Sequence, residues 1–364
     1  MGEWRRTTWG NVITLQRGFD ITKNSQALNG VIPVVSSGGV SSYHDKAMSQ
    51  GPGVIMGRKG TLGRVHYIEG PYWPHDTTLW VCNFKGNDPR FVYYALKGID
   101  PVFLNVGSAS PTLNRNHIHP LPVWWPSSTI QRAVAEVLGA LDDKIAANDR
   151  ALSVGDSLVR ADFARLSGEP ITLENLVTSV REQIDPKSRP EATPYVGLEH
   201  VPRRRMWLQE FGTANMVSSA KSSFQEGDVL FGKLRPYFHK VVQAAFSGIA
   251  STDILVLRAK RPELAGLALA AASSDGAVAA ATGTADGTRM PRANWSVLKE
   301  VRVPWPGDAE AVRFSRRVDS IARLAAGLTA ETRALGSTRD ELLPLLMSGR
   351  LHVKDAEKVV AEVV

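Results

Sequence analysis

One segment decides the fold, and it is Ser127–Gly168, SSTIQRAVAEVLGALDDKIAANDRALSVGDSLVRADFARLSG. Small and apolar residues recur in it at alternating steps of four and three, the repeat of a coiled-coil seam. The seam positions are Val134, Leu138, Leu141, Ile145, Asn148, Leu152, Gly155, Val159 and Asp162. Ser127–Thr129 supply N-cap residues and Gly168–Pro170 supply a stop. The segment therefore predicts one helix of about 40 residues, roughly 60 Å long at ~1.5 Å per residue.

A second segment near the C-terminus carries the same seam. Adding 180 to each position gives Phe314, Val318, Ile321, Ala325, Leu328, Thr332, Leu335, Arg339 and Leu342. In this alignment a polar or glycine residue of one seam often faces an apolar residue of the other. We predict that the two helices pack together as a spacer; the alternative is that both are ordinary bundle helices of one globular core. Gly155 and Pro344 weaken the helices by about 1 and 3 kcal/mol respectively, and we expect Pro344 to kink the last turns.

The segments outside the two helices also match each other in order, which predicts a duplication. The offset between matching segments grows from 175 to 180, as small loop insertions would make it grow. The matches are Gly53–Lys59 with Asp228–Leu234 at 175, His75–Leu79 with Thr252–Leu255 at 177, Gly107–Arg115 with Gly283–Arg292, and Val123–Pro126 with Val303–Pro306 at 180.

Short apolar runs bounded by glycine and proline predict strands in the first lobe. These runs are Val31–Val35, Gly53–Gly57, Gly63–Ile68 and Thr77–Cys82, followed by a predicted helix at Pro89–Lys97. The predicted fold class is α+β: two α/β lobes separated by two long antiparallel coiled-coil helices, with a pseudo-twofold internal repeat. The predicted boundaries are 1–126 for the first lobe, 127–168 for the first helix, 169–307 for the second lobe, 308–350 for the second helix and 351–364 for a C-terminal tail.

Composition is that of a globular protein of two or three domains, with 364 residues, 43% of them hydrophobic, and a mean hydropathy of −0.14. The most apolar stretch, Leu264–Ala281, contains an Asp and two Gly, so we expect no membrane segment. The N-terminus lacks the apolar core of a signal peptide. The lone Cys82 excludes an internal disulfide and predicts a buried strand residue. We therefore expect a cytoplasmic location.

The positive charge is concentrated outside the two helices. Lys and Arg against Asp and Glu number 12 to 7 in residues 1–126, 5 to 6 in 127–168, 17 to 14 in 169–307 and 9 to 9 in 308–364, giving the net charge of +7. A sequence pI near 9.5 suggests a polyanionic partner, although an excess of this size also occurs in proteins without one.

The sequence predicts no catalytic residue and no metal ligand. Gly227–Lys233 satisfies the phosphate-binding pattern G-x-x-x-x-G-K, but Leu234 stands where Ser or Thr would hold magnesium, and the intervening residues predict a strand. The adenine methyltransferase signature, Asn or Asp followed by Pro-Pro-Tyr/Phe, is absent, and the eight His have no metal-binding spacing. A nuclease centre assembled from scattered carboxylates stays open.

Several motifs resemble those of a known family, the specificity (S) subunits of type I restriction-modification systems. The resemblance covers nearly the whole chain and rests on the order of its motifs. These are the turns Gly57–Gly60 and Gly232–Arg235, the run Thr252–Val256, the turn Gly107–Arg115, and the terminal Glu341–Leu351, ELLPLLMSGRL. The resemblance implies that the lobes are target-recognition domains and that the chain has no chemistry of its own. It implies double-stranded DNA and two adenine methyltransferase (M) subunits as partners, with restriction (R) subunits when present. No cofactor would bind this chain: S-adenosylmethionine would belong to the M subunits, and ATP and Mg to the R subunits.

The candidate DNA-binding residues lie in turns that follow strands or precede the last strand of each lobe. Arg can bond guanine through two donors, and Asn can do the same with adenine. In the first lobe the candidates are Arg58, Lys59, Arg64, Asn114 and Arg115. In the second they are Arg203, Arg204, Arg205, Lys233, Arg235, His239, Lys240, Arg289 and Arg292; only Glu199 and Glu210 lie near the Arg203–Arg205 run in sequence.

For each candidate a simpler role stays open: solvated surface charge for the cations and turn chemistry for Asn114. Tyr237 could equally pack or stack. Trp124, Trp125 and Trp305 are expected in the core.

Two unlike basic lobes on a spacer match a bipartite site on duplex DNA, which repeats about every 34 Å. The first functional hypothesis is therefore a DNA specificity subunit that recognises one half-site with each lobe. The alternatives are a two-lobed protein-interaction scaffold without a nucleic-acid role, and a nuclease or DNA-modifying enzyme.

Overall fold

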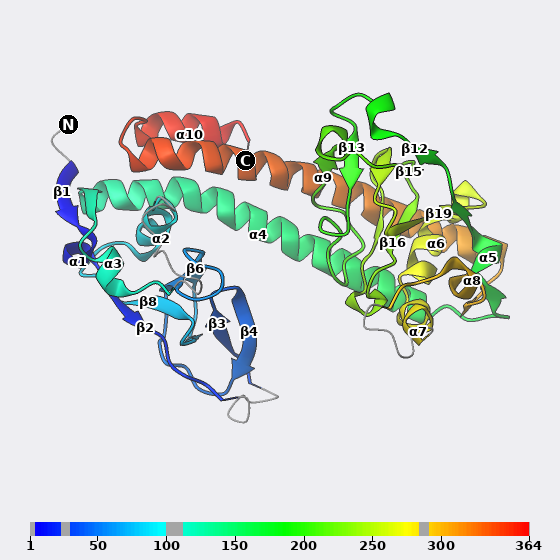
Figure 1. Cartoon of the computed structure of the whole chain (residues 1–364), viewed down its shortest axis with the longest axis horizontal. Helices are drawn as coiled ribbons and strands as arrows, with labels where there is room; N and C mark the ends of the chain where they lie inside the picture. The colour runs from blue at the N-terminus through cyan, green and yellow to red at the C-terminus, as the bar shows by residue number, and fades with distance from the viewer. Residues whose placement is uncertain (1–3, 23–29, 100–111, 284–290, 364) are drawn as a thin grey trace. The chain divides into compact units, whose positions relative to one another are not determined.

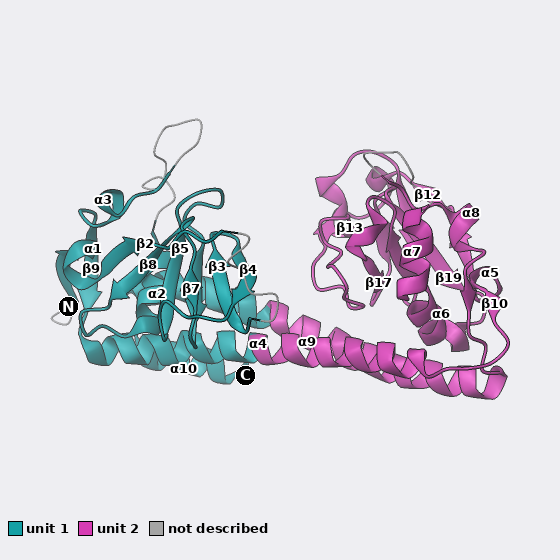
Figure 2. Ribbon diagram, turned by 90° about the horizontal axis from the view of Figure 1, so that it is seen from below, with its two compact units in different colours: residues 1–145, 334–364 teal, residues 146–333 magenta. Residues whose placement is uncertain are grey.

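Two long helices, α4 (Ser128–Ala164) and α9 (Asp308–Met347), run through the fold (Figure 1). The computed structural model describes residues 4–22, 30–99, 112–283 and 291–363. The chain divides into two compact units (Figure 2): unit 1 is Met1–Ile145 with Ala334–Val364, and unit 2 is Ala146–Arg333. Each long helix therefore contributes residues to both units.

The main sheet of unit 1 is antiparallel throughout, in the order β2-β8-β5-β6. Its strands are Thr14–Arg17, Thr78–Asn83, Gly53–Gly57 and Val65–Ile68, so three of the predicted apolar runs are confirmed as strands. The predicted helix α2 (Pro89–Lys97) begins at a proline after the N-cap Asp88, whose side chain accepts a hydrogen bond from the amide of Phe91. α2 and the buried β5 share one core.

The remaining elements of unit 1 form two smaller sheets. One has the order β4-β3-β7, with β3 and β7 parallel; its strands are Gly39–His44, Ile32–Ser36 and Trp73–Pro74. The other pairs β1 (Trp4–Thr8) with β9 (Pro122–Pro126), and the short helices α1 (Trp9–Val12) and α3 (Arg115–Ile118) complete the unit.

The C-terminal residues of unit 1 are helical. A plain tail was predicted for 351–364, but Val353–Ala361 form helix α10. Its Ala356 and Val360 are buried in the same core as Leu342 and Leu346 of α9. A sequence reading missed this helix because its apolar face is short and becomes meaningful only when it packs on other helices.

The main sheet of unit 2 has the order β11-β19-β16-β17, again antiparallel throughout. Its strands are Val177–Val180, Ile254–Ala259, Val229–Gly232 and Val241–Gln243. β16 occupies the middle of the Gly227–Lys233 pattern, which is therefore a strand and not a phosphate-binding loop.

A second sheet of unit 2 has the order β12-β15-β18-β13-β14, with β13 and β18 parallel. Its strands are Gln183–Ile184, Lys221–Phe224, Gly248–Ala250, Pro194–Val196 and Gly212–Thr213. Other elements are the strand pair β10 (Ile171–Thr172) and β20 (Arg302–Val303), helices α5 (Leu173–Leu176) and α8 (Trp295–Leu298), and the 3-10 turns η3 (Pro186–Ser188), η4 (Ala214–Met216), η5 (Pro236–Phe238) and η6 (Pro262–Leu264).

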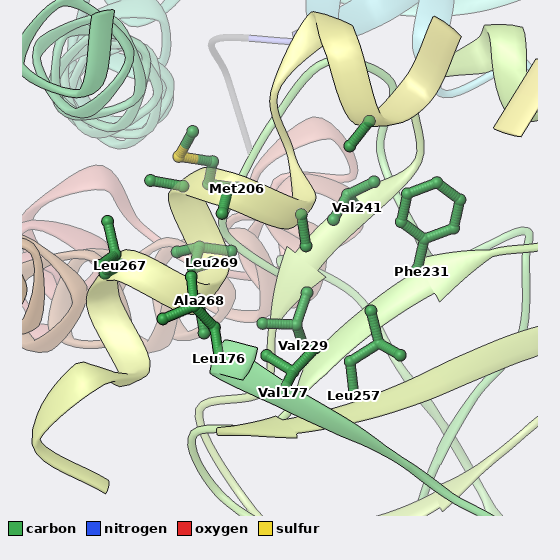
Figure 3. Close-up of a cluster of buried hydrophobic side chains, with 14 of the residues drawn as sticks. Leu176, Val177, Met206, Val229, Phe231, Val241, Leu257, Leu267, Ala268 and Leu269 are labelled. Carbon is green, nitrogen blue, oxygen red and sulfur yellow. The ribbon is translucent and has the colours of Figure 1, made fainter. Parts of the chain in front are cut away.

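Figure 3 shows the core of unit 2, where sheet residues such as Val229 and Leu257 face Leu267 and Leu269 of helix α6 (Ala265–Ala272). α6 and α7 (Asp275–Gly283) are the alanine-rich stretch seen in the sequence. Within the described ranges no single helix is long and apolar enough to cross a membrane. Only the pair Pro262–Ala272 and Asp275–Gly283, bent by 61°, passes a length and composition test together.

The seam residues of both long helices are buried or half-buried. In unit 2 the Asn148 amide donates to Glu331 (2.7 Å), and in unit 1 Arg339 donates to Asp142 (2.7 Å). Polar groups therefore meet polar groups, and the predicted facing of polar with apolar residues was wrong at these positions. The reason is direction: partners in an antiparallel pair have numbers with a constant sum, whereas the alignment by 180 assumed a constant difference.

The two units share a strand order. β2-β8-β5-β6 corresponds in chain order to β11-β19-β16-β17, and each unit also has one parallel pair, β3 with β7 and β13 with β18. Gly57 of β5 pairs with Thr78 of β8, and Gly232 of β16 pairs with Ile254 of β19. Thr78 therefore corresponds to Ile254, which is an offset of 176 and not the predicted 177. Cys82, expected in the core, is exposed at the end of β8.

Candidate nucleic-acid interface

The turn after β5 places Arg58 at one edge of the main sheet in unit 1. The Arg58 amide donates to the carbonyl of Thr77 (2.9 Å), and its carbonyl accepts from the amide of Leu113 (2.9 Å). Its guanidinium donates to the carbonyls of Asp76 (3.0 Å) and Leu113 (3.3 Å). The side chain is half-buried and oriented, because strands and the segment before α3 hold it from two sides.

Arg58 lines a cavity of about 390 Å³ together with Asn114 and Arg115, so the structure brings Arg58 next to a predicted pair that lies far from it in the sequence. Arg17 lines the same cavity and was missed. It forms ion pairs with Asp20 (2.7 Å) and Asp76 (3.3 Å). A single cation at a strand end has no motif, so only the fold reveals it.

Two other candidates of unit 1 lie outside this cavity. Lys59 and Arg64 are both exposed, Lys59 next to Gly60, whose φ of +73° forms a left-handed turn. The Arg64 carbonyl accepts from the amide of Gly57 (2.8 Å) and closes the hairpin. Both side chains are exposed at this turn, and their contact with phosphates stays a prediction.

Asn114 has a turn role in addition. It is the N-cap of α3, and its side-chain oxygen accepts from the amide of Asn116 (3.2 Å). Asn294 does the same for α8, accepting from the amide of Ser296 (3.1 Å). The alternative of turn chemistry is confirmed for the Asn114 oxygen, and the amide nitrogen of each residue carries two donors.

Unit 2 repeats the arrangement around Lys233. The Lys233 amide donates to the carbonyl of Asp253 (2.8 Å), and its carbonyl accepts from the amide of Ala293 (2.8 Å). Its ammonium donates to the carbonyl of Thr252 (2.6 Å), and burial lowers the pKa of Lys233. A cavity of about 380 Å³ is lined by Lys233, Asn294 and Arg181, the last of which the sequence did not single out.

The two cavities occupy the same place in the topology. Each lies at the end of the first strand of the main sheet and beside an asparagine N-cap. Each also lies beside the cation that follows β5 or β16. This cation donates to a carbonyl two residues before the neighbouring strand of the sheet, β8 or β19. The backbone hydrogen bonds around Arg58 and Lys233 agree, whereas the side chains that line the two cavities differ. Arg292 flanks the second cavity, pairing with Asp253 (3.4 Å), and Arg289 lies outside the described residues.

The run Arg203–Arg205 has carboxylate partners that the sequence did not suggest. Arg205 pairs with Asp149 of α4 (2.8 Å), and Arg204 pairs with Asp275 of α7 (3.0 Å). Arg203 lies over the ring of Phe238, 3.8 Å from its centroid. Arg205 is therefore an internal contact of unit 2, and its prediction as a phosphate anchor is corrected.

The turn 233–240 joins β16 to β17 and holds four candidates of unequal exposure. His239 is 2% exposed, its Nε2 lies 2.8 Å from the Ser273 carbonyl, and burial lowers its pKa. The structure does not support its prediction as a DNA contact, because the ring is buried, with Nδ1 3.5 Å from a carboxylate oxygen of Asp275. Lys240 is half-buried and donates to the carbonyl of Leu198 (2.5 Å), while Arg235 has a left-handed φ of 51°.

The two tryptophans of β9 differ in exposure. Trp125 is 1% exposed as expected, but Trp124 is 60% exposed, because neighbouring residues of β9 alternate between faces.

Over the part of the chain that the structure describes, His, Cys, Asp and Glu form no group able to hold a metal ion.

Known proteins resemble the chain in sequence and in fold. Residues 1–153 match the family model of the type I restriction modification DNA specificity domain. The type I restriction enzyme EcoDI specificity subunit of Escherichia coli is 33% identical over 107 residues, a stretch that spans 29% of this chain and 23% of the relative. The crystal structure of the type I restriction-modification S subunit from M. genitalium has a TM-score of 0.61 at 16% identity, covering 94% of this chain and 96% of that one, and shows the same fold. Residues 1–153 thus resemble the type I restriction modification DNA specificity domain, and the chain has the fold of a type I restriction-modification S subunit.

Proposed function

We propose that the chain selects a bipartite DNA sequence for a type I restriction-modification complex, with one half-site recognised by the target-recognition domain of each unit. The observation that carries this proposal is the pair of matching cavities around Arg58 and Lys233. Their backbone hydrogen bonds agree, while their side chains differ. A shared backbone arrangement that carries two different sets of side chains suits the recognition of two different short sequences.

The chemistry of each cavity fits the edges of bases. Arg58, Arg115 and Arg17 can donate to guanine or phosphate, and the amide nitrogen of Asn114 can donate to an acceptor on a base. In unit 2, Lys233 and Arg181 are the corresponding cations, with Asn294 beside them. Since Arg58 and Lys233 are held by carbonyls before DNA arrives, these two side chains would lose little entropy on binding.

Exposed and half-buried cations around the cavities would contact phosphates and supply much of the affinity. They are Lys59 and Arg64 in unit 1, and Arg203, Arg204, Arg235, Lys240 and Arg292 in unit 2, with Arg289 a further candidate from the sequence. Such contacts release counterions, so binding would weaken steeply with salt. A two-lobed protein scaffold would lack this dependence.

The long helices would act as the spacer between the domains, predicted as 1–126 and 169–307. Their paired seams, with polar partners such as Asn148 and Glu331, would fix the register of an antiparallel pair and so the gap between half-sites. Their exposed faces would dock two M subunits, to which S-adenosylmethionine would belong. The matching strand orders support an origin by duplication, and the chain itself would carry out no chemical step.

Domain exchange tests the proposal. Residues 169–307 are replaced by the corresponding segment of another S subunit, the chimaera is expressed with the M subunits, and methylated adenines are mapped by single-molecule sequencing. We expect one half of the methylated sequence to change and the other half to stay. The matched control exchanges residues 1–126 and should change the opposite half. If either exchange alters both halves or neither, the modular proposal is wrong.

A further inference from the structure

The 3-10 turn η5 (Pro236–Phe238) of unit 2 presents an aromatic ring to solvent. Tyr237 is 51% exposed, whereas Phe238 beside it is covered by the guanidinium of Arg203, 3.8 Å from the ring centroid. The rings of Tyr237 and Phe238 are 4.8 Å apart at an angle of 68°. One aromatic of the pair thus anchors the turn while the other is free to contact a partner.

The backbone of the turn is fixed in an unusual conformation. Arg235 and His239, the residues on either side of η5, both have left-handed φ angles, of 51° and 53°. Residues other than glycine seldom adopt this conformation, and such strain is concentrated at functional sites. Pro236 restricts the turn further, and the Gly232 amide closes the hairpin by donating to the Lys240 carbonyl (2.8 Å).

Hydrogen bonds to neighbouring segments stabilise the turn. The carbonyl of Ser273 lies 2.8 Å from Nε2 of His239 and accepts from Arg160 of α4 (2.9 Å). The carbonyl of His239 accepts from the amide of Arg204 (2.8 Å). Since these groups are tied to α4 and to the end of α6, the backbone that carries Tyr237 is held in place before any partner binds.

The turn that carries this ring is rich in cations. Lys233, Arg235 and Lys240 belong to the same turn, and Arg203 lies on it through Phe238. The nearby carboxylates have partners: Asp253 pairs with Arg292, and Asp275 pairs with Arg204. Glu199 interacts electrostatically with Lys240. An exposed aromatic among cations is the arrangement that stacks on nucleobases while the charges follow the phosphates.

Unit 1 differs at the corresponding turn. Its residues Arg58–Arg64 are Arg-Lys-Gly-Thr-Leu-Gly-Arg and contain no aromatic residue. Gly60 and Gly63 take its left-handed positions, with φ of +73° and +71°. The stacking group is therefore particular to unit 2.

We propose that Tyr237 inserts its ring at one base step of the half-site recognised by unit 2, stacks on a nucleobase and partly unstacks it from its neighbour. The proposal rests on the proposed function and adds a mode of contact to it. Apolar and aromatic side chains that enter a base step bend the duplex and increase the protein surface that it covers. The half-site of unit 1 would keep its stacking.

The experiment measures stacking directly in the complex of the whole chain with its M subunits. The probe is a duplex that carries the sequence methylated in cells expressing the chain, with 2-aminopurine placed at one purine at a time. For the wild type we expect a rise in fluorescence at one step of the second half-site. Tyr237→Phe should keep the rise. Tyr237→Ala should abolish it and raise the dissociation constant roughly 5- to 150-fold, as loss of one stacked base does.

Tyr43→Ala is the matched control, because Tyr43 is also a tyrosine, is also 51% exposed, and lies on β4 of unit 1. It should leave the signal in the second half-site unchanged. If the wild type binds its site without any unstacked step, or if Tyr237→Ala keeps the signal, the stacking proposal is overturned and the proposed function stands. If the wild type does not prefer the methylated sequence to a scrambled duplex, both fail.

Discussion

Asp149 of α4 accepts hydrogen bonds from Nη2 of Arg205 on both carboxylate oxygens, at 2.8 and 2.9 Å. Asp156, two turns further along α4, lies 3.7 Å from the other terminal nitrogen of Arg205. A residue that was predicted from the sequence to contact DNA thus joins the sheet region of unit 2 to the long helix. The two preceding residues have other contacts, Arg204 with Asp275 and Arg203 with the ring of Phe238, and both are exposed.

Arg205→Ala should destabilise unit 2 without changing the number of phosphate contacts. It removes a half-buried guanidinium and leaves Asp156 without its cation, so we expect a loss of about 1–3 kcal/mol in the free energy of unfolding by urea. Arg203→Ala, the matched control two residues away, should keep the stability and reduce the slope of log binding constant against log salt by about 1. The reverse pattern would mean that Arg205, not Arg203, contacts DNA.

Asp156 should give unit 2 a stability that depends on pH. Burial is the main cause that raises its pKa from 3.8 to about 6, against the opposing hydrogen bond from the Met206 amide and the charge of Arg205. Because the folded pKa is above the unfolded one, the contribution to stability is complete below pH 3.8 and is lost as pH rises through about 6.

The comparison with Asp156→Asn isolates this group from the other carboxylates. The unfolding free energy of the wild type minus that of the variant should fall between pH 4 and pH 6, by up to about 1.4 kcal/mol per pH unit. Urea titrations at several pH values measure it. A difference that rises with pH would show that the ion pair with Arg205, and not desolvation, dominates.

Gly266→Ala should destabilise the packing of α6 on α9 in unit 2. A methyl group there would meet the carbonyl oxygen of Ser315 and Cβ of Val318, both at 2.7 Å. We expect a loss of about 1–3 kcal/mol from overpacking. Gly327→Ala on α9 is the matched control, with nothing within 4 Å of the added carbon, and it should stabilise the helix by up to about 1 kcal/mol. Equal effects of the two changes in urea unfolding would rule out the close contact as the cause.

Arg58→Ala should relax the choice of bases in one half-site only. Loss of a base contact costs about 1–3 kcal/mol, and adenine methylation mapped in cells should show degenerate positions in the first half of the sequence. Lys233→Ala should have the same effect on the second half. Arg64→Ala, an exposed cation outside the cavity, should weaken binding evenly across sequences. Degeneracy in both halves after a single substitution would contradict the assignment of one cavity to each half-site.

The sequence by itself determined the two long helices, most strands of the main sheet in unit 1, and the turns that carry Arg58 and Lys233. These features depend on residues near one another in the chain. A seam repeats every three or four residues, and a strand is a short apolar run between turn formers, so local patterns are sufficient. The strand nature of Gly227–Lys233 followed in the same way.

Only the tertiary structure decided which groups meet. It gave Arg205 its partner on α4, turned His239 inward, exposed Cys82 and Trp124, and added Arg17 and Arg181 to the two cavities. Each of these outcomes depends on packing between segments distant in the chain, where the direction of a helix or the face of a strand selects the partner. Periodicity shows that one face of a helix or strand is buried. Which segment packs against that face depends on the free energy of packing and pairing.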